Sequence, residues 1–214
     1  MQILLTSATD SEISATTQWL KGLKENKNIS CAVTGIGSAI TAYTLTKIVR
    51  GLNPGLVIQA GIAGTYSESF PPGSTVIIQE DGFADLGALE NHEFTDVFDL
   101  GLISTNETPF SNKFLFNPHL DQFKKYDLPY VRGATVNCIS SSPEQVAMLI
   151  DKYNPVVESM EGAALHYVCL MENIPFLQLR SISNFAGERN KQHWKIKEAV
   201  QNLNNELKRI LLDY

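Results

Sequence analysis

The sequence predicts an α/β protein in which helices cover both faces of a parallel or mixed sheet. Short apolar segments of strand length alternate with segments of helical periodicity along most of the chain, a pattern typical of such sheets. The hydrophobic content of 43% and the charged content of 19% are those of a globular protein. No repeat, low-complexity segment or linker divides the chain, so we expect one domain spanning residues 1–214.

The first part of the chain alternates three strands with two helices. The predicted strands are residues 2–5, 31–34 and 56–60. Apolar residues at helical spacing predict one helix that ends at Lys24 and another that runs from Ile40 through Val49. Glycine-containing segments follow the second and third strands, at 35–37 and 61–64. Because glycine adopts positive φ at little cost, we interpret both as tight strand-to-helix turns, which would also let a ligand approach the backbone.

The middle of the chain is less regular. A strand is predicted over 75–79 and a polar, glycine-bearing loop over 80–89. Residues 91–117 show no convincing periodicity and are expected to run over the surface, and loops of this length are usually functional. A strand over 130–136 precedes Ser142-Pro143-Glu144, where proline at the first helical position predicts the start of a helix.

In the last part, an apolar strand is predicted at 155–157. Met160 and Glu161 follow it and are therefore expected at the edge where open α/β sheets bind ligands. The elements predicted after it are a helix over 162–171, a strand over 176–182, a polar loop over 183–192 and an amphipathic helix over 194–211.

Charge and cysteine usage narrow the possible partners. A net charge of -6 argues against nucleic acid or an anionic membrane as partner, which leaves small molecules. Cys31, Cys138 and Cys169 are odd in number and widely spaced, so we expect neither a disulfide framework nor a zinc site, but buried thiols in a reducing compartment. The N-terminus has no signal-peptide pattern and no segment is long and apolar enough to span a bilayer. These features predict a cytoplasmic protein, and nothing in the sequence implies a metal or organic cofactor.

Two acidic residues are candidates for chemistry, and each has a purely structural alternative. Glu161 follows a strand and can accept two hydroxyl donors, so it is suited to bind a vicinal diol above Met160. The alternative is a helix whose first-turn acids favour the helix dipole. Glu12 is a candidate general base, but Thr9-Asp10-Ser11-Glu12 also matches the capping box, in which the glutamate only caps a helix.

Arg180 lies near the end of the next predicted strand, and Asn184 follows it by four residues at the start of the loop. A buried arginine is seldom unpaired, so Arg180 is expected either in a structural ion pair with Glu161 or Glu12, or in the same pair while orienting a nucleophilic water. Asn184 either contacts a ligand or is an ordinary turn asparagine.

Five segments of the sequence together resemble the nucleoside phosphorylase and hydrolase superfamily. They are LLTSATDSE (4–12), TGIGSAI (34–40), AGIAG (60–64), VESMEGAAL (157–165) and RSISN (180–184). The resemblance is strongest to the branch of methylthioadenosine/S-adenosylhomocysteine nucleosidases and futalosine hydrolases, and FADLG (83–87) and ESMEGA (158–163) resemble the latter. It implies a three-layer α/β/α sandwich on a mixed, partly closed, twisted sheet, and a homo-oligomer.

The resemblance also assigns expected roles to residues of this chain. It puts the base that activates water on Glu12, the diol-binding pair on Met160 and Glu161, the water-orienting arginine on Arg180 and the residue that faces the purine N7 edge on Asn184. The slot for the purine base would be completed by Cys138, Ile139, Phe185 and Ala186.

Three positions depart from the pattern of the adenine-specific nucleosidases. Asn184 stands where those enzymes have an aspartate that protonates N7, and its amide offers both a donor and an acceptor, which suits O6 and N7–H of hypoxanthine better than adenine. Ile62 replaces a serine that helps hold the water. Ser159 replaces a glutamate, while Glu158 stands one position earlier, and whether Glu158 compensates is left open.

The expected reaction is hydrolysis of the N-glycosidic bond of futalosine to hypoxanthine and dehypoxanthine futalosine, a step of menaquinone biosynthesis. Asp10 and Glu12 lie where a phosphorylase would hold phosphate, so water is favoured as the nucleophile. The alternatives are a purine nucleoside phosphorylase or nucleosidase acting on inosine or methylthioadenosine, and a non-catalytic nucleoside-binding protein. Arg189, Lys191 and His193 are candidates to bind the carboxyphenyl tail of futalosine, or form only a solvated loop.

Overall fold

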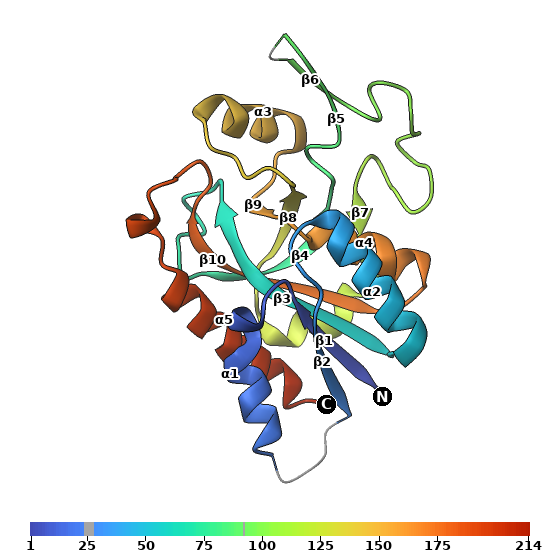
Figure 1. Ribbon diagram of the computed structural model, residues 1–214, viewed down its shortest axis with the longest axis vertical. Coiled ribbons are helices and arrows are strands. Elements are labelled where there is room, and N and C mark those ends of the chain that lie inside the picture. Colours follow the sequence, from blue (N-terminus) through green and yellow to red (C-terminus); the bar gives the residue numbers. More distant parts are fainter. Residues whose placement is uncertain (24–27, 92) are drawn as a thin grey trace.

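A mixed sheet of eight strands is the centre of the computed structural model of the chain, which describes residues 1–23, 28–91 and 93–214 (Figure 1). Its strands are β1 (Ile3–Ser7), β2 (Ile29–Val33), β3 (Leu56–Thr65), β4 (Thr75–Asp81), β7 (Leu115–Phe116), β8 (Tyr130–Thr135), β9 (Val157–Ser159) and β10 (Phe176–Phe185).

The sheet closes partly on itself. Its strand order is β10-β4-β8-β9-β3-β1-β2, and β10 also pairs with β3, so that β3, β10, β4, β8 and β9 form a closed ring. The short strand β7 pairs with β4. The pairs β10–β4, β3–β9 and β4–β7 are antiparallel, whereas β1–β2, β1–β3, β10–β3, β4–β8 and β8–β9 are parallel. The expectation of a mixed, partly closed sheet is therefore confirmed.

Helices lie on both faces of this sheet, as the sequence predicts (Figure 1). The helices are α1 (Asp10–Lys21), α2 (Ser38–Leu52), α3 (Pro143–Tyr153), α4 (Gly162–Met171) and α5 (Ile196–Leu211). Side chains of β1 alternate between two cores: Leu5 packs in a cluster with residues of α1 and α5, and Leu4 in a cluster with residues of α2 and α4. This alternation follows from the two-residue period of a strand and gives the three layers.

One predicted helix boundary holds because a local signal sets it, and another helix ends earlier than predicted. The α3 helix begins at Pro143, and Ser142 Oγ accepts a hydrogen bond from the Gln145 backbone N–H as its N-cap. The α1 helix ends at Lys21, before Gly22, so Leu23 lies beyond it. Lys24, where this helix was predicted to end, lies outside the described residues.

The second glycine segment is not a turn, which corrects the sequence interpretation. Gly35 and Gly37 have a φ of 87° and do form a turn, but residues 61–64 continue β3. Strand β10 likewise continues through Asn184 to Phe185 instead of becoming a loop at 183. Strands β3 and β10 both run further than predicted because they pair in parallel along almost their whole length. No local sequence pattern reveals this long-range contact.

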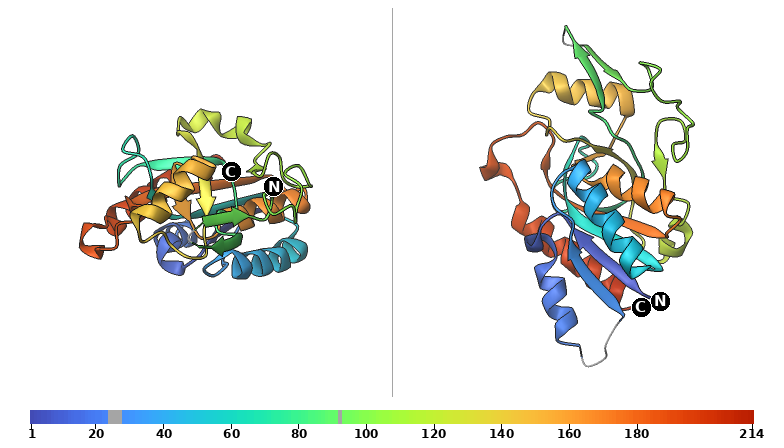
Figure 2. Two further views of the ribbon diagram at one scale, coloured as in Figure 1. Left: turned by 90° about the horizontal axis from the view of Figure 1, so that it is seen from above. Right: turned by 45° about the vertical axis from the view of Figure 1, so that its right-hand side comes forward.

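The irregular middle of the chain runs over the surface but contains more structure than predicted. Strands β5 (Gly87–Glu90) and β6 (Glu93–Asp96) pair as a separate antiparallel sheet, which projects beyond α3 in two views (Figures 1 and 2). A 3-10 helix, η1 (Leu120–Tyr126), follows. None of the described helices is long and apolar enough to cross a membrane. Of the three cysteines, Cys169 is buried as expected, but Cys31 and Cys138 are exposed.

Candidate active site

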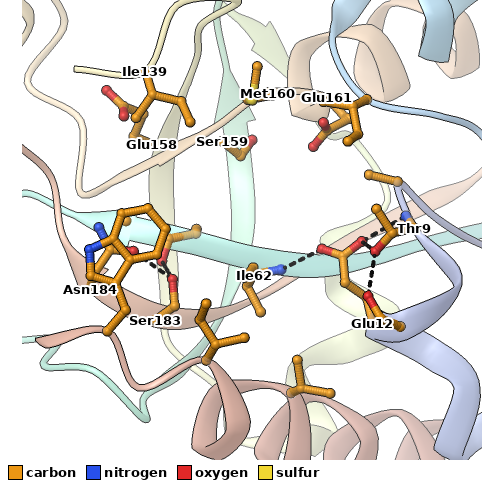
Figure 3. A pocket seen from close by; sticks show the side chains of 18 residues that line it. Thr9, Glu12, Ile62, Ile139, Glu158, Ser159, Met160, Glu161, Ser183 and Asn184 are labelled. Atoms are coloured by element: carbon orange, nitrogen blue, oxygen red, sulfur yellow. Dashed lines mark hydrogen bonds between the residues drawn. The ribbon is translucent and has the colours of Figure 1, made fainter. Parts of the chain in front are cut away.

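The candidate active site is a pocket of about 280 Å³ at the carboxyl ends of β1, β3 and β10 (Figure 3), the edge at which α/β sheets bind ligands. The described residues that line it are Ala8, Thr9, Ser11, Glu12, Ile36, Ile62, Ala63, Gly64, Ile139, Glu158, Ser159, Met160, Glu161, Ser183, Asn184, Trp194, Ile196 and Val200. Figure 3 shows two ends. We call the region of Glu12 and Glu161 the arginine end, because Arg180 Nη2 lies 3.9 Å from Glu161 Oε2. The region of Glu158, Ser183 and Asn184 is the asparagine end.

Glu12 both caps α1 and lines the pocket. Its Oε2 accepts from the Thr9 backbone N–H at 3.0 Å and from Thr9 Oγ1 at 3.0 Å, while its Oε1 accepts from the Ile62 backbone N–H at 3.1 Å. The two sequence interpretations of this residue are therefore compatible, because the cap leaves Oε1 on the pocket side. With one donor bound, Oε1 retains acceptor capacity for a ligand.

Glu161 lies across the pocket from Glu12 (Figure 3). Its Oε1 accepts from the Gly37 backbone N–H at 3.1 Å, and its Oε2 lies 3.9 Å from Arg180 Nη2. Burial raises the pKa of Glu161, the charge of Arg180 and the Gly37 N–H oppose that shift, and nearby Glu12 adds to it. The first glycine turn thus holds a carboxylate that lies 124 residues away in the sequence.

Arg180 is fully buried beneath this end of the pocket. Its Nη2 donates to Gln59 Oε1 at 2.6 Å, but Nε and Nη1 have no hydrogen-bond partner among the described residues. A Cβ on Gly61 would lie 2.1 Å from Arg180 Nη1 and 2.9 Å from Glu12 Oε1. Gly61 therefore provides space rather than a turn: its missing side chain lets the guanidinium and the Glu12 carboxylate approach each other.

The asparagine end is bonded internally. Asn184 Oδ1 accepts from Ser183 Oγ at 2.6 Å, and Nδ2 donates to the Phe185 backbone oxygen at 2.8 Å. These bonds leave the amide one lone pair and one N–H. The carboxylate of Glu158 is also in this region and accepts from Tyr66 Oη, Ser140 Oγ and the Ser140 backbone N–H.

Most of the predicted site residues come together, but not all of them. Glu12, Ile62, Ile139, Ser159, Met160, Glu161 and Asn184 line the pocket, and Arg180 lies beneath it. Cys138, Phe185 and Ala186 are not among the described lining residues. Phe185 follows Asn184 on β10, so strand alternation turns its side chain to the opposite face, where it is 42% exposed. Cys138 is exposed, with its backbone N–H bound to Asp85, and the Ala186 N–H is bound to the Thr65 oxygen.

Several contributors to the site were not predicted as such, and four of them have a clear role or position. Thr9 orients Glu12, Gly37 orients Glu161 and Ser183 orients Asn184, and Trp194 lines the pocket. The capping box and the glycine turn are local signals that accompany the first two. Trp194 offers no such signal, because it reaches the pocket only through the path of the loop after β10.

The proposed tail-binding residues lie near the pocket rather than in its lining. The guanidinium of Arg189 stacks 5.6 Å from the ring centre of Trp194, whereas His193 Nδ1 is 2.7 Å from Glu188 Oε2.

The C-terminal helix fixes the helix that carries Glu12. Asn204 on α5 accepts at Oδ1 from the backbone N–H and the hydroxyl of Thr16, at 2.9 and 2.6 Å. Its Nδ2 donates to the Glu12 backbone oxygen at 2.8 Å. Asn204 is buried, so these bonds hold the first turns of α1 without competition from bulk solvent. Among the residues described, no group of three or more His, Cys, Asp or Glu side chains is placed to hold a metal ion.

Comparisons with known proteins agree with this architecture. The family model described as the phosphorylase superfamily matches residues 9–214. A futalosine hydrolase of Thermus thermophilus is 30% identical over 184 residues, which cover 84% of this chain and 80% of the relative. A 5'-methylthioadenosine/S-adenosylhomocysteine nucleosidase of Bacillus cereus is 27% identical over 191 residues, which cover 84% of this chain and 78% of the relative.

Solved structures of the same two kinds share the fold. A futalosine hydrolase of Helicobacter pylori superposes with a TM-score of 0.85 at 19% identity, over 100% of this chain and 98% of the other. A nucleosidase complex from Helicobacter pylori gives 0.83 at 19% identity, over 100% of this chain and 99% of the other. The family match over 9–214 and the 30% identical relative are decisive: the chain belongs to the phosphorylase superfamily.

Proposed function

We propose that the protein is a hydrolase that cleaves the N-glycosidic bond of futalosine and releases hypoxanthine and dehypoxanthine futalosine. The observation that carries the proposal is that Glu12 and Glu161, 149 residues apart in the sequence, line one pocket above the charge of Arg180, with Asn184 at its other end. The 30% identical relative, a futalosine hydrolase, supports the choice of substrate.

In this proposal the arginine end binds the ribose and the attacking water. Glu161 accepts hydrogen bonds from the ribose hydroxyls, and the Gly37 N–H keeps its carboxylate in place. Water lies between Glu12 Oε1, which retains a lone pair, and Arg180 Nη1, whose N–H lacks a protein partner among the described residues. Glu12 then takes the proton as water attacks the anomeric carbon.

The charge of this end favours cleavage by water. With Glu12 and Glu161 ionised and Arg180 protonated, the three groups carry one net negative charge, which stabilises an oxocarbenium-like sugar. The same charge opposes a phosphate dianion, so we assign hydrolysis and not phosphorolysis.

At the asparagine end, Asn184 stabilises the departing base. The bond between the anomeric carbon and N9 breaks with its electron pair going to the base, and N7 takes a proton from solvent because the amide has none to give. The free N–H of Asn184 donates to O6 of hypoxanthine and its free lone pair accepts from N7–H, because Ser183 and Phe185 occupy only the other half of the amide. Adenine presents an amino group where hypoxanthine has O6, so it loses one of these bonds.

The test is incubation with futalosine, inosine or methylthioadenosine, each with and without phosphate, followed by chromatography of the released bases. We expect hypoxanthine from futalosine at a rate that phosphate does not change. Adenine released from methylthioadenosine faster than hypoxanthine from futalosine would establish a nucleosidase instead, phosphate dependence would establish a phosphorylase, and binding without turnover would establish a nucleoside-binding protein.

The resemblance to the family also supports a proposal for the pathway, the cellular compartment and the oligomeric state. We place the reaction in menaquinone biosynthesis by the futalosine pathway, in the cytoplasm, and the protein in a homo-oligomer. Light scattering of the purified chain measures the last point, and a monomeric mass at the working concentration would contradict it.

A further inference from the structure

Glu158 and Asn184 face each other across a single glycine. Asn184 on β10 pairs with Gly64 on β3, and Gly64 pairs on its other side with Glu158 on β9. Residues paired across neighbouring strands project to the same side of a sheet, and both side chains line the pocket. Neighbouring strands are about 4.8 Å apart, so the two backbones are separated by roughly 9 to 10 Å, with no side chain between them.

Gly64 places no side chain in this gap, which leaves its backbone as a surface on which a flat ring can rest. A Cβ on Gly64 would lie 3.5 Å from Asn184 Nδ2 and 3.6 Å from the backbone N and Cα of Ala186, so the bare side of the glycine faces the asparagine and the adjoining Ala186 backbone. Ile139 lies at the same end of the pocket (Figure 3). A planar base that rests on Gly64 therefore presents one edge to Asn184 and the adjacent edge to Glu158.

Glu158 is held as a hydrogen-bond acceptor. Tyr66 Oη and Ser140 Oγ both donate to Oε2, and the Ser140 backbone N–H donates to Oε1 at 3.2 Å. Burial and the neighbouring carboxylate raise the pKa of Tyr66, so the phenol keeps its proton and remains a donor. An ionised carboxylate has about four acceptor positions, and these three bonds leave one on Oε1.

We infer that Glu158 is a specificity-determining residue that accepts a hydrogen bond from N1–H of a 6-oxopurine. In hypoxanthine, N1 carries a hydrogen and lies next to O6. The N7–O6 edge of the base can therefore hydrogen-bond to Asn184 while the adjacent N1–H donates to Glu158. In adenine, N1 is an unprotonated acceptor and would meet the carboxylate lone pairs. The site thus discriminates between the two bases at N1, which carries a hydrogen only in hypoxanthine, as well as at the group attached to C6. This inference rests on the proposed function for the identity of the leaving base.

The test measures the binding of free bases by calorimetry, which does not depend on turnover. For the parent protein we expect hypoxanthine to bind roughly 10- to 100-fold more tightly than 1-methylhypoxanthine, the range for loss of a hydrogen bond to a charged group. Glu158→Gln should reduce the hypoxanthine-to-adenine affinity ratio at least tenfold, because a neutral amide oxygen accepts more weakly from N1–H than a carboxylate and repels the N1 lone pair of adenine less. Glu68→Gln, the same change at an exposed residue, should leave the ratio unchanged.

Two results would overturn the inference. One is an affinity ratio that Glu158→Gln leaves unchanged while its melting temperature matches the parent. The other needs no variant: N1-methylation that weakens binding to the parent protein by less than about threefold would mean that no acceptor faces N1. Hydrolysis of futalosine with an unchanged ratio would remove this inference alone, whereas a strong preference for hypoxanthine without hydrolysis of futalosine would remove the proposed function alone.

Discussion

The two ends of the pocket differ in how many of their donors and acceptors already have hydrogen-bond partners within the protein. At the arginine end, Arg180 keeps Nε and Nη1 without a partner among the described residues, and its nearest recorded carboxylate, that of Glu161, is 3.9 Å from Nη2. At the asparagine end, Glu158 has three donors and Asn184 two partners. Unpaired buried donors are costly unless a ligand binds them, whereas groups held by two or three protein hydrogen bonds keep one orientation and offer only their remaining donor or acceptor to a ligand. The comparison suggests that the first end performs the chemistry and the second selects the base.

The largest effect should come from Glu12→Gln at the arginine end. Removing a general base typically costs 10²- to 10⁴-fold in rate, so we expect kcat for futalosine to fall within about that range. Stopped assays with purified variants measure it, with Asp10→Asn as the matched control on the exposed side of the same helical turn. If Glu12→Gln retains turnover within about tenfold of the parent, a barrier change of ~1.4 kcal/mol, Glu12 is not the base.

A second comparison sets Gly61→Ala against Gly64→Ala. A methyl group at 61 would collide with buried Arg180, and overpacking of this kind costs about 1 to 3 kcal/mol of unfolding free energy. A methyl group at 64 meets protein atoms only at 3.5 Å or more, so we expect little loss of stability there but weaker binding of hypoxanthine.

Urea unfolding and calorimetry with the free base separate the two effects. Equal losses of stability in both variants would contradict the assignment of Gly61 as space for Arg180 and of Gly64 as space for the ligand.

The smallest expected effect is a change of preference in Asn184→Asp. A carboxylate can accept from N7–H but cannot donate to O6, so the ratio of hypoxanthine to adenine nucleoside cleavage should fall by roughly tenfold, the effect of one unmatched polar contact. Competition assays with futalosine and methylthioadenosine measure this ratio. An unchanged ratio would show that Asn184 does not contact O6.

The order of strands and helices could be predicted from the sequence because each element carries its own periodicity and end signals. Pro143 after Ser142 and the capping box at Thr9 are local, and both helices begin where these residues indicate. A strand just before Glu161 was predicted at 155–157 and is found two residues later, as β9 at Val157–Ser159, so the position of Glu161 past a strand end was predictable but the strand bounds were not.

What the sequence could not reveal is set by pairing between distant segments. Residues 61–64 have the appearance of a turn, yet they continue β3 because β10 pairs along them. The same pairing keeps Asn184 in a strand and turns Phe185 away from the pocket. The path that brings Trp194 into the lining, and the register that places Glu158 opposite Asn184, also depend on contacts that no local pattern encodes.

The bonds from Asn204 to Thr16 and Glu12 have a consequence for biosynthesis. They join residues 188 and 192 positions apart, so the helix with Glu12 emerges from the ribosome long before the residue that anchors it. At 5 to 20 residues per second, roughly ten seconds or more must pass before that anchor exists. A nascent chain should therefore have its central strands before it can hydrolyse anything, and activity should appear abruptly once residue 204 has been translated and released.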